Sequence, residues 1–157
     1  MLKITRPQTP QHDPHAVFMK KEKKQQIADK KYWFLIENNT FKVDCLVLLN
    51  YTLDESSKII KQETGEEYEF LQKESKGTEV LGSFFALEKG YCILLNWYKN
   101  TYQDNMLFAL HELLHLTHHV LRNVRVPLTE QSEEVYTYLF ENFTRQFMDK
   151  TWKKYYK

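Results

Sequence analysis

The chain has 157 residues, a net charge of +1 at neutral pH, and an aromatic composition with ten Tyr, ten Phe and three Trp. This length suits one domain with its own apolar core, and the small net charge gives no reason to expect a nucleic-acid partner. No apolar run reaches the roughly 18–20 residues of a membrane span, so we expect no membrane partner. Cys45 and Cys92 are isolated and form no disulfide framework, which favours a reducing, cytoplasmic setting.

The first 31 residues differ from the rest in composition. Pro7, Pro10 and Pro14 interrupt any early helix. Eight Lys or Arg stand against three Asp or Glu, so this block carries a net charge of +5 and leaves −4 for the remainder. We therefore predict a basic N-terminal arm over 1–31, ending in a polar helix, and a folded domain over 32–157. The arm is interpreted either as a solvated tail or as a segment that docks on a partner or on a polyanion.

Short apolar runs after the arm predict a small sheet. The aromatic segment 32–36 opens the folded domain, and the run 43–49 predicts a mostly buried strand. Two further apolar runs, 81–87 and 91–97, are separated by three residues that end in Gly90. This spacing is typical of a β-hairpin.

The first helix of the domain is expected over 53–61, directly after the first buried strand. Thr52 or Asp54 supplies its N-cap. Ile59 and Ile60 are its apolar residues, and we expect them to pack this helix back onto the sheet.

Two longer helices are expected after the hairpin. The first ends near Arg122, because Pro127 bars its continuation. The second runs over about 130–150, with Thr129 as its N-cap. Candidate caps for the start of the first are Asn100, Thr101 and Asp104.

The first of these long helices contains the pattern His111-Glu112-x-x-His115, and four of the six histidines of the chain fall between 111 and 119. Helical residues four apart lie on one face, so both imidazoles can bind one metal ion while Glu112 leans toward a metal-bound water. A zinc ion with three protein ligands keeps a position for water and lowers the pKa of that water. Apolar residues surround the motif on nearly all sides, which predicts a buried helix whose imidazoles need a partner.

The third zinc ligand is expected from the final helix, where Glu133 and Glu134 are the candidates. Steps of 100° per residue put Glu133 at the edge of the apolar stripe and Glu134 nearly opposite, so periodicity favours Glu133. Glu134 and Tyr138, four apart, would instead form a second face against the metal-binding helix. His118 is a candidate hydrogen-bond donor beside the ligands, as is Tyr138, and His119 is an alternative ligand.

The order His-Glu-x-x-His, a short loop, then Glu-x-x-small-Tyr resembles a group of small phage-encoded proteins with a minimal zincin-like metallopeptidase core. The resemblance covers about 43–147. It implies an α+β fold in which a small mixed sheet with a hairpin packs on the metal-binding helix, followed by a C-terminal helix. It maps the zinc ligands onto His111, His115 and Glu134 and the general base onto Glu112. The basic arm departs from that pattern, as do the two histidines that follow the motif.

We therefore expect a zinc-dependent metallopeptidase or amidase acting on a peptide or protein substrate. The alternative is a non-catalytic, zinc-stabilised phage structural, assembly or binding protein, which the basic arm and the aromatic tail over 152–157 favour. The arm would then dock on a phage or host protein. The expected location is the cytoplasm, that of the host cell for a phage-encoded protein, or else the virion.

Overall fold

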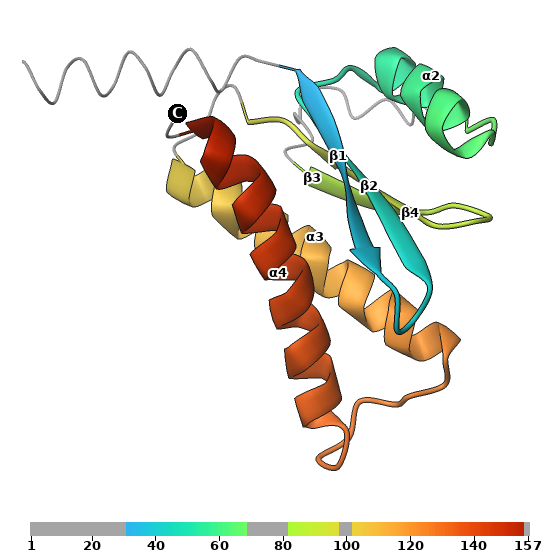
Figure 1. Cartoon of the computed structure of the whole chain (residues 1–157), viewed down its shortest axis with the longest axis vertical. Coiled ribbons are helices and arrows are strands. Elements are labelled where there is room, and N and C mark those ends of the chain that lie inside the picture. Colours follow the sequence, from blue (N-terminus) through green and yellow to red (C-terminus); the bar gives the residue numbers. More distant parts are fainter. Residues whose placement is uncertain (1–30, 69–81, 98–101, 156–157) are drawn as a thin grey trace, which may run out of the picture.

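The computed structural model describes residues 31–68, 82–97 and 102–155. Within these ranges the chain forms a four-stranded mixed sheet and three helices, so the expected α+β class is confirmed (Figure 1). The predicted arm lies outside the described residues except for Lys31. None of the described helices is long and apolar enough to cross a membrane.

The sheet has the strand order β1-β2-β4-β3. Strand β2 pairs antiparallel with β1 and parallel with β4, while β3 pairs antiparallel with β4. The predicted buried strand is therefore central, and the predicted hairpin is β3–β4. The strands are β1 (Tyr32–Asn38), β2 (Val43–Leu49), β3 (Gly82–Ala86) and β4 (Tyr91–Leu95).

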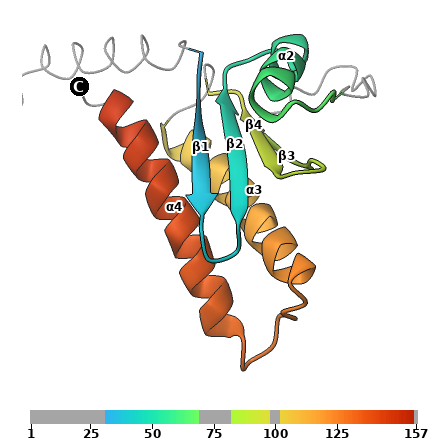
Figure 2. The same ribbon diagram turned by 45° about the vertical axis from the view of Figure 1, so that its right-hand side comes forward.

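Helices cover both faces of the sheet (Figures 1 and 2). The long helices α3 (Tyr102–Asn123) and α4 (Glu133–Tyr155) lie on one face, and the short helix α2 (Leu53–Thr64) lies on the other. Each face has its own apolar cluster, because successive residues of a strand point to opposite sides. In β4, for example, Ile93 belongs to the α3–α4 side and Cys92 to the α2 side.

The predicted start of α2 is confirmed. Thr52 is its N-cap and forms a capping box with Glu55, and Gly65 ends the helix with a positive φ of 76°. Ile60 is fully buried against the sheet, as the apolar pattern predicted.

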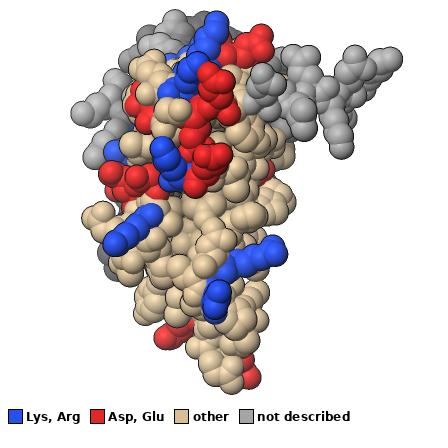
Figure 3. Space-filling model, turned by 90° about the vertical axis from the view of Figure 1, so that its right-hand side faces the viewer, with Lys and Arg blue, Asp and Glu red and all other residues tan. Residues whose placement is uncertain are grey.

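On the face drawn in Figure 3, acidic and basic side chains gather mainly at one end of the molecule, whereas much of the remaining surface is uncharged.

The predicted start of the last helix is wrong. Thr129 does not cap it; a turn spans Thr129 to Ser132, whose backbone N–H donates to the Thr129 carbonyl at 3.1 Å, and α4 begins at Glu133. The Ser132 hydroxyl donates to the Pro127 carbonyl, which holds the turn after the proline. The Thr129 side chain suits a turn as well as a helix cap, so its identity alone did not fix the boundary.

A buried amide chain fastens the start of α3 to the sheet. Asn50, at the end of β2, accepts a hydrogen bond from the Trp97 backbone N–H at 2.6 Å. The side chain of Asn105 in turn donates to the Trp97 carbonyl at 3.0 Å. These two hydrogen bonds join the end of β2, the segment after β4 and the first turns of α3. They therefore help to fix the position of α3 against the sheet, on the N-terminal side of the histidine motif.

Candidate metal site

His111 and His115 meet on one face of α3. Their Nε2 atoms are 3.1 Å apart and their ring centroids 4.7 Å apart. Two nitrogens at this separation, each about 2.0–2.1 Å from one zinc ion, would subtend about 100° at the metal, close to a tetrahedral angle. The pair therefore fits two adjacent zinc positions, and without metal the same separation suits an N–H···N hydrogen bond between the rings.

The prediction that this helix is buried all round is wrong. Both histidines are exposed, and Leu107 and Leu114 beside them are 65% and 47% exposed. Other sides of α3 are covered by the sheet and by α4, which leaves one side open to solvent. The sequence shows that α3 has apolar residues on nearly all sides. It does not show which of these sides the sheet and α4 leave uncovered. As a result, the histidine pair lies at a surface accessible to a ligand.

Glu112 is buried, with 7% of its surface exposed, and it forms no hydrogen bond with another described residue. Burial raises the pKa of its carboxyl group, and the two neighbouring imidazoles act in the opposite direction. A carboxylate that is partly removed from water and accepts no hydrogen bond from the described residues is destabilised in its charged form. Such groups with shifted pKa values are concentrated at functional sites, where they accept and release protons.

Gly82, in β3, makes room for this carboxylate. A Cβ atom at Gly82 would lie 3.0 Å from the Glu112 Oε1 atom and 3.1 Å from the Leu95 Cδ2 atom. Sequence reasoning did not assign this glycine to the site. An isolated glycine in a strand signals close approach of another group, and that signal was present in the hairpin.

A row of rings leads from the histidine pair along β3. The ring of Phe84 lies 6.3 Å from that of His115 and 4.9 Å from that of His119. The Tyr91 ring is 6.4 Å from His119, and its hydroxyl accepts a hydrogen bond from the Asn123 side chain at 2.7 Å. His119, the alternative ligand, therefore packs among aromatic rings on the β3 side of the helix.

His118 and the predicted acidic ligands lie toward α4. The exposed His118 ring is 5.2 Å from that of Tyr136, whose hydroxyl donates to the Val126 carbonyl at 2.9 Å. Glu133 and Glu134 occupy the first turn of α4 and are exposed, as is Tyr138 one turn later.

The structure brings together two of the expected ligands. Among the described residues, no three side chains of the His, Cys, Asp or Glu types converge in a geometry that could hold a metal. The choice between Glu133 and Glu134 therefore stays a prediction.

The two cysteines are buried in different apolar clusters, Cys45 on the α3–α4 side and Cys92 on the α2 side. Burial raises the pKa of the Cys45 thiol, and it raises that of Cys92 to about 12. Because the thiolate is the form that binds metals, these thiols have the chemistry of small core residues.

No protein-family model matches this sequence, and no curated protein or solved structure shows significant similarity to it. The resemblance to zincin-like proteins remains a hypothesis based on the motif, alongside the α+β class that the structure shows.

Proposed function

We propose that the protein is a zinc-dependent hydrolase of peptide or amide bonds, with its site on the exposed face of α3. The observation that supports this most is the 3.1 Å separation of the His111 and His115 Nε2 atoms, next to the buried carboxylate of Glu112. A surface pair of imidazoles is available to a ligand, and the carboxylate beside it is available as a proton acceptor.

Zinc is the proposed cofactor, held by His111, His115 and Glu134. Bound zinc would supply a water molecule of lowered pKa and a positive charge that polarises a substrate carbonyl. The two histidines are already preorganised for this role, since α3 presents them on one face at a suitable separation. Glu134 is exposed in the first turn of α4, and binding zinc would require its side chain to reach the pair.

Glu112 is the proposed general base. Its raised pKa increases its affinity for the proton that the attacking water releases, and Gly82 leaves its carboxylate room beside β3. The same group then holds that proton for the leaving nitrogen. Replacing the carboxylate by an amide removes the proton acceptor and preserves the shape of the side chain.

The outer edge of β3 is the proposed binding surface for the substrate backbone. Among the described strands β3 pairs only with β4, and a peptide that bonds to its other edge would extend the sheet by one strand. Phe84 in the same strand lies against His115, which brings this edge close to the site.

The first experiment compares Glu112→Gln with wild-type protein loaded with zinc. We expect equal zinc content by atomic spectroscopy and at least a thousandfold lower cleavage of a peptide library by mass spectrometry, because proton transfer to the base is lost. Glu141→Gln, an exposed change on α4, is the matched control and should cleave like wild type. Equal cleavage by both variants would contradict the proposed base.

The second experiment tests the ligands. We expect His115→Ala and Glu134→Gln to lose bound zinc, whereas Glu133→Gln keeps it. Equal zinc in wild type and His115→Ala would remove the basis of the proposal. Loss of zinc in Glu133→Gln alone would move the third ligand by one residue and leave the proposed reaction intact. Zinc bound without cleavage of any peptide would favour the non-catalytic alternative.

A further inference from the structure

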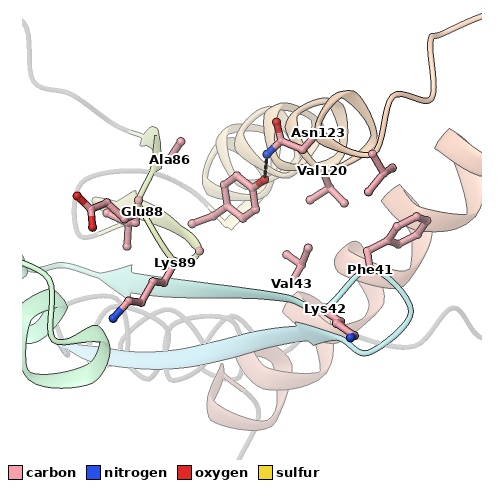
Figure 4. Close-up of a pocket in the computed structure, with 12 residues that line it drawn as sticks. Phe41, Lys42, Val43, Ala86, Glu88, Lys89, Val120 and Asn123 are labelled. Atoms are coloured by element: carbon pink, nitrogen blue, oxygen red, sulfur yellow. Dashed lines mark hydrogen bonds between the residues drawn. The ribbon is translucent and has the colours of Figure 1, made fainter.

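A cavity of about 290 Å³ lies at one end of the sheet (Figure 4). Its walls come from the turn between β1 and β2, the β3–β4 hairpin, and the last turns of α3. This volume is at the small end of the range for ligand sites and suits one large side chain or a molecule of that size. The apolar lining residues are Phe41, Val43, Ala86, Leu87, Val120 and Val124.

The interior of this cavity is uncharged. Its polar groups include the Tyr91 hydroxyl and the Asn123 amide, which hydrogen-bond to each other at 2.7 Å. Burial raises the pKa of the Tyr91 phenol, so the phenol is neutral at neutral pH. Lys42, Glu88 and Lys89 belong to the rim, and Figure 4 shows their charged ends directed away from the centre. An occupant therefore meets apolar walls and one neutral hydrogen-bonded pair.

The cavity is aligned with the candidate metal site along β3. Alternate residues of this strand meet successive parts of α3: Gly82 lies beside Glu112, Phe84 beside His119, and Ala86 lines the cavity. At about 3.4 Å per residue, Ala86 is roughly 14 Å along the strand from Gly82. Ala86 is small and exposed, and it lines the cavity on the β3 side.

We propose that the cavity binds a large apolar side chain, aromatic or long aliphatic, of a peptide that lies extended along the outer edge of β3. The inference rests on the proposed function, because it takes β3 as the substrate-binding edge. Side chains of an extended peptide alternate between faces, so a residue four positions away points to the same face. The side chain in the cavity is thus about four residues from the peptide residue level with Glu112.

The binding test uses fluorescein-labelled nonapeptides of Ala and Thr that carry one Phe or, in the control peptide, one Ser. Binding to full-length Glu112→Gln protein is measured by fluorescence anisotropy, since that background does not turn the peptide over. We expect the Phe peptide to bind at least about tenfold more tightly, the gain typical of burying one large apolar side chain. N-acetyl-phenylalaninamide should bind far more weakly than the Phe peptide; equal affinity would indicate a small-molecule site and overturn the peptide proposal.

Two variants fill the cavity from its exposed rim. Ala86→Trp and Val124→Trp should remove the preference for Phe over Ser, and Val135→Trp, the same change at an exposed valine of α4, should keep it. Circular dichroism melting verifies that each variant is folded. If the two cavity variants keep the preference, or the wild-type cavity shows none, the proposed subsite is overturned.

Cleavage supplies a readout that separates this inference from the proposed hydrolase. In zinc-loaded wild type, cleaved library peptides should be enriched in large apolar residues about four positions from the cut bond, on one side of it, and Val124→Trp should lose that enrichment. Cleavage without the enrichment overturns the subsite and leaves the hydrolase. Phe-dependent binding that the cavity variants abolish, without any cleavage, supports the subsite and overturns the hydrolase.

Discussion

The two outer strands of the sheet, β1 and β3, differ in the hydrogen bonds made at their outer edges. On β1, Gln146 of α4 accepts a hydrogen bond from the Glu37 backbone N–H at 3.1 Å and donates to its carbonyl at 2.8 Å. On β3, no described strand pairs with the outer edge. An amide side chain has the same donor and acceptor as a peptide unit, so Gln146 completes β1 at this position as another strand would.

The helices beside these edges explain the difference. The side of α4 that faces β1 carries amides, with Asn142 also bonded to Asn38 at 3.3 Å. The side of α3 near β3 carries imidazoles and a carboxylate that form no hydrogen bond to the strand. The outer edge of β1 is therefore bonded to α4 at Glu37, whereas no described strand pairs with the outer edge of β3 beside the histidine pair.

The largest effect is expected from removing the packing that holds α4 over β1. Phe147 is fully buried between the rings of Phe34 and Trp97, with centroids at 5.7 and 5.6 Å. Phe147→Ala should lower the free energy of unfolding by about 3–5 kcal/mol, measured by urea titration. Met148→Ala, at the exposed neighbouring position, should change it by less than about 1 kcal/mol. Similar losses in both would contradict the role given to Phe147.

A smaller effect is expected on β3, beside the histidine pair. Gly82→Ala puts a Cβ atom 3.0 Å from the Glu112 Oε1 atom, so the carboxylate must shift. We expect a loss of about 10- to 100-fold in kcat/KM for the proposed hydrolysis, because small displacements of a catalytic group are costly. Ser83→Ala, whose side chain points to the opposite face, is the control. Unchanged kcat/KM in Gly82→Ala would show that the carboxylate position is not critical.

Removing the hydrogen bonds between Gln146 and the edge of β1 should lower the free energy of unfolding by about 1 kcal/mol. Gln146→Leu removes both hydrogen bonds to Glu37, and water replaces them in part. The exposed strand should also increase self-association, measured by sedimentation velocity. Gln62→Leu makes the same change on the exposed side of α2 and is the matched control. If the two variants associate equally, the amide does not protect the edge.

The smallest effect concerns the residue that precedes β1. Lys31 donates to Glu55 of α2 at 2.6 Å, and this hydrogen bond, with those from Thr52, lowers the Glu55 pKa to about 2. A lowered pKa stabilises the fold above the unfolded-state pKa and is lost as pH falls toward 2. Glu55→Gln should therefore lower the melting temperature slightly at pH 7, with the difference vanishing near pH 2. Glu63→Gln is the control, and a difference independent of pH would contradict the pairing.

Much of the fold follows from local sequence patterns. The run Val43–Leu49 matches β2 at both ends, since a continuous apolar run buried on both faces has clear limits. Strand β1 was anticipated only as an aromatic opening, because Trp33 and Glu37 are exposed and dilute its apolar pattern. The start of α4 was placed too early, because a turn beginning at Thr129 has the same residue types as a helix cap.

The candidate site divides in the same way. The meeting of His111 and His115 follows from helical spacing alone, which the sequence contains. The contact between Gly82 and Glu112 joins segments thirty residues apart. The exposure of the histidine pair depends on which side of α3 the helix α4 packs against. Neither the contact nor the exposure can be predicted from the spacing of apolar residues within one helix or strand.

The amide bonded to the edge of β1 also bears on assembly. If two copies joined through the outer edges of β3, each would present β1 outward, where Gln146 occupies the main chain of Glu37. At Glu37 a third copy would meet a main chain that already bonds to an amide, which disfavours strand pairing at that position. Gln146 would thus oppose open-ended assembly through the outer edge of β1.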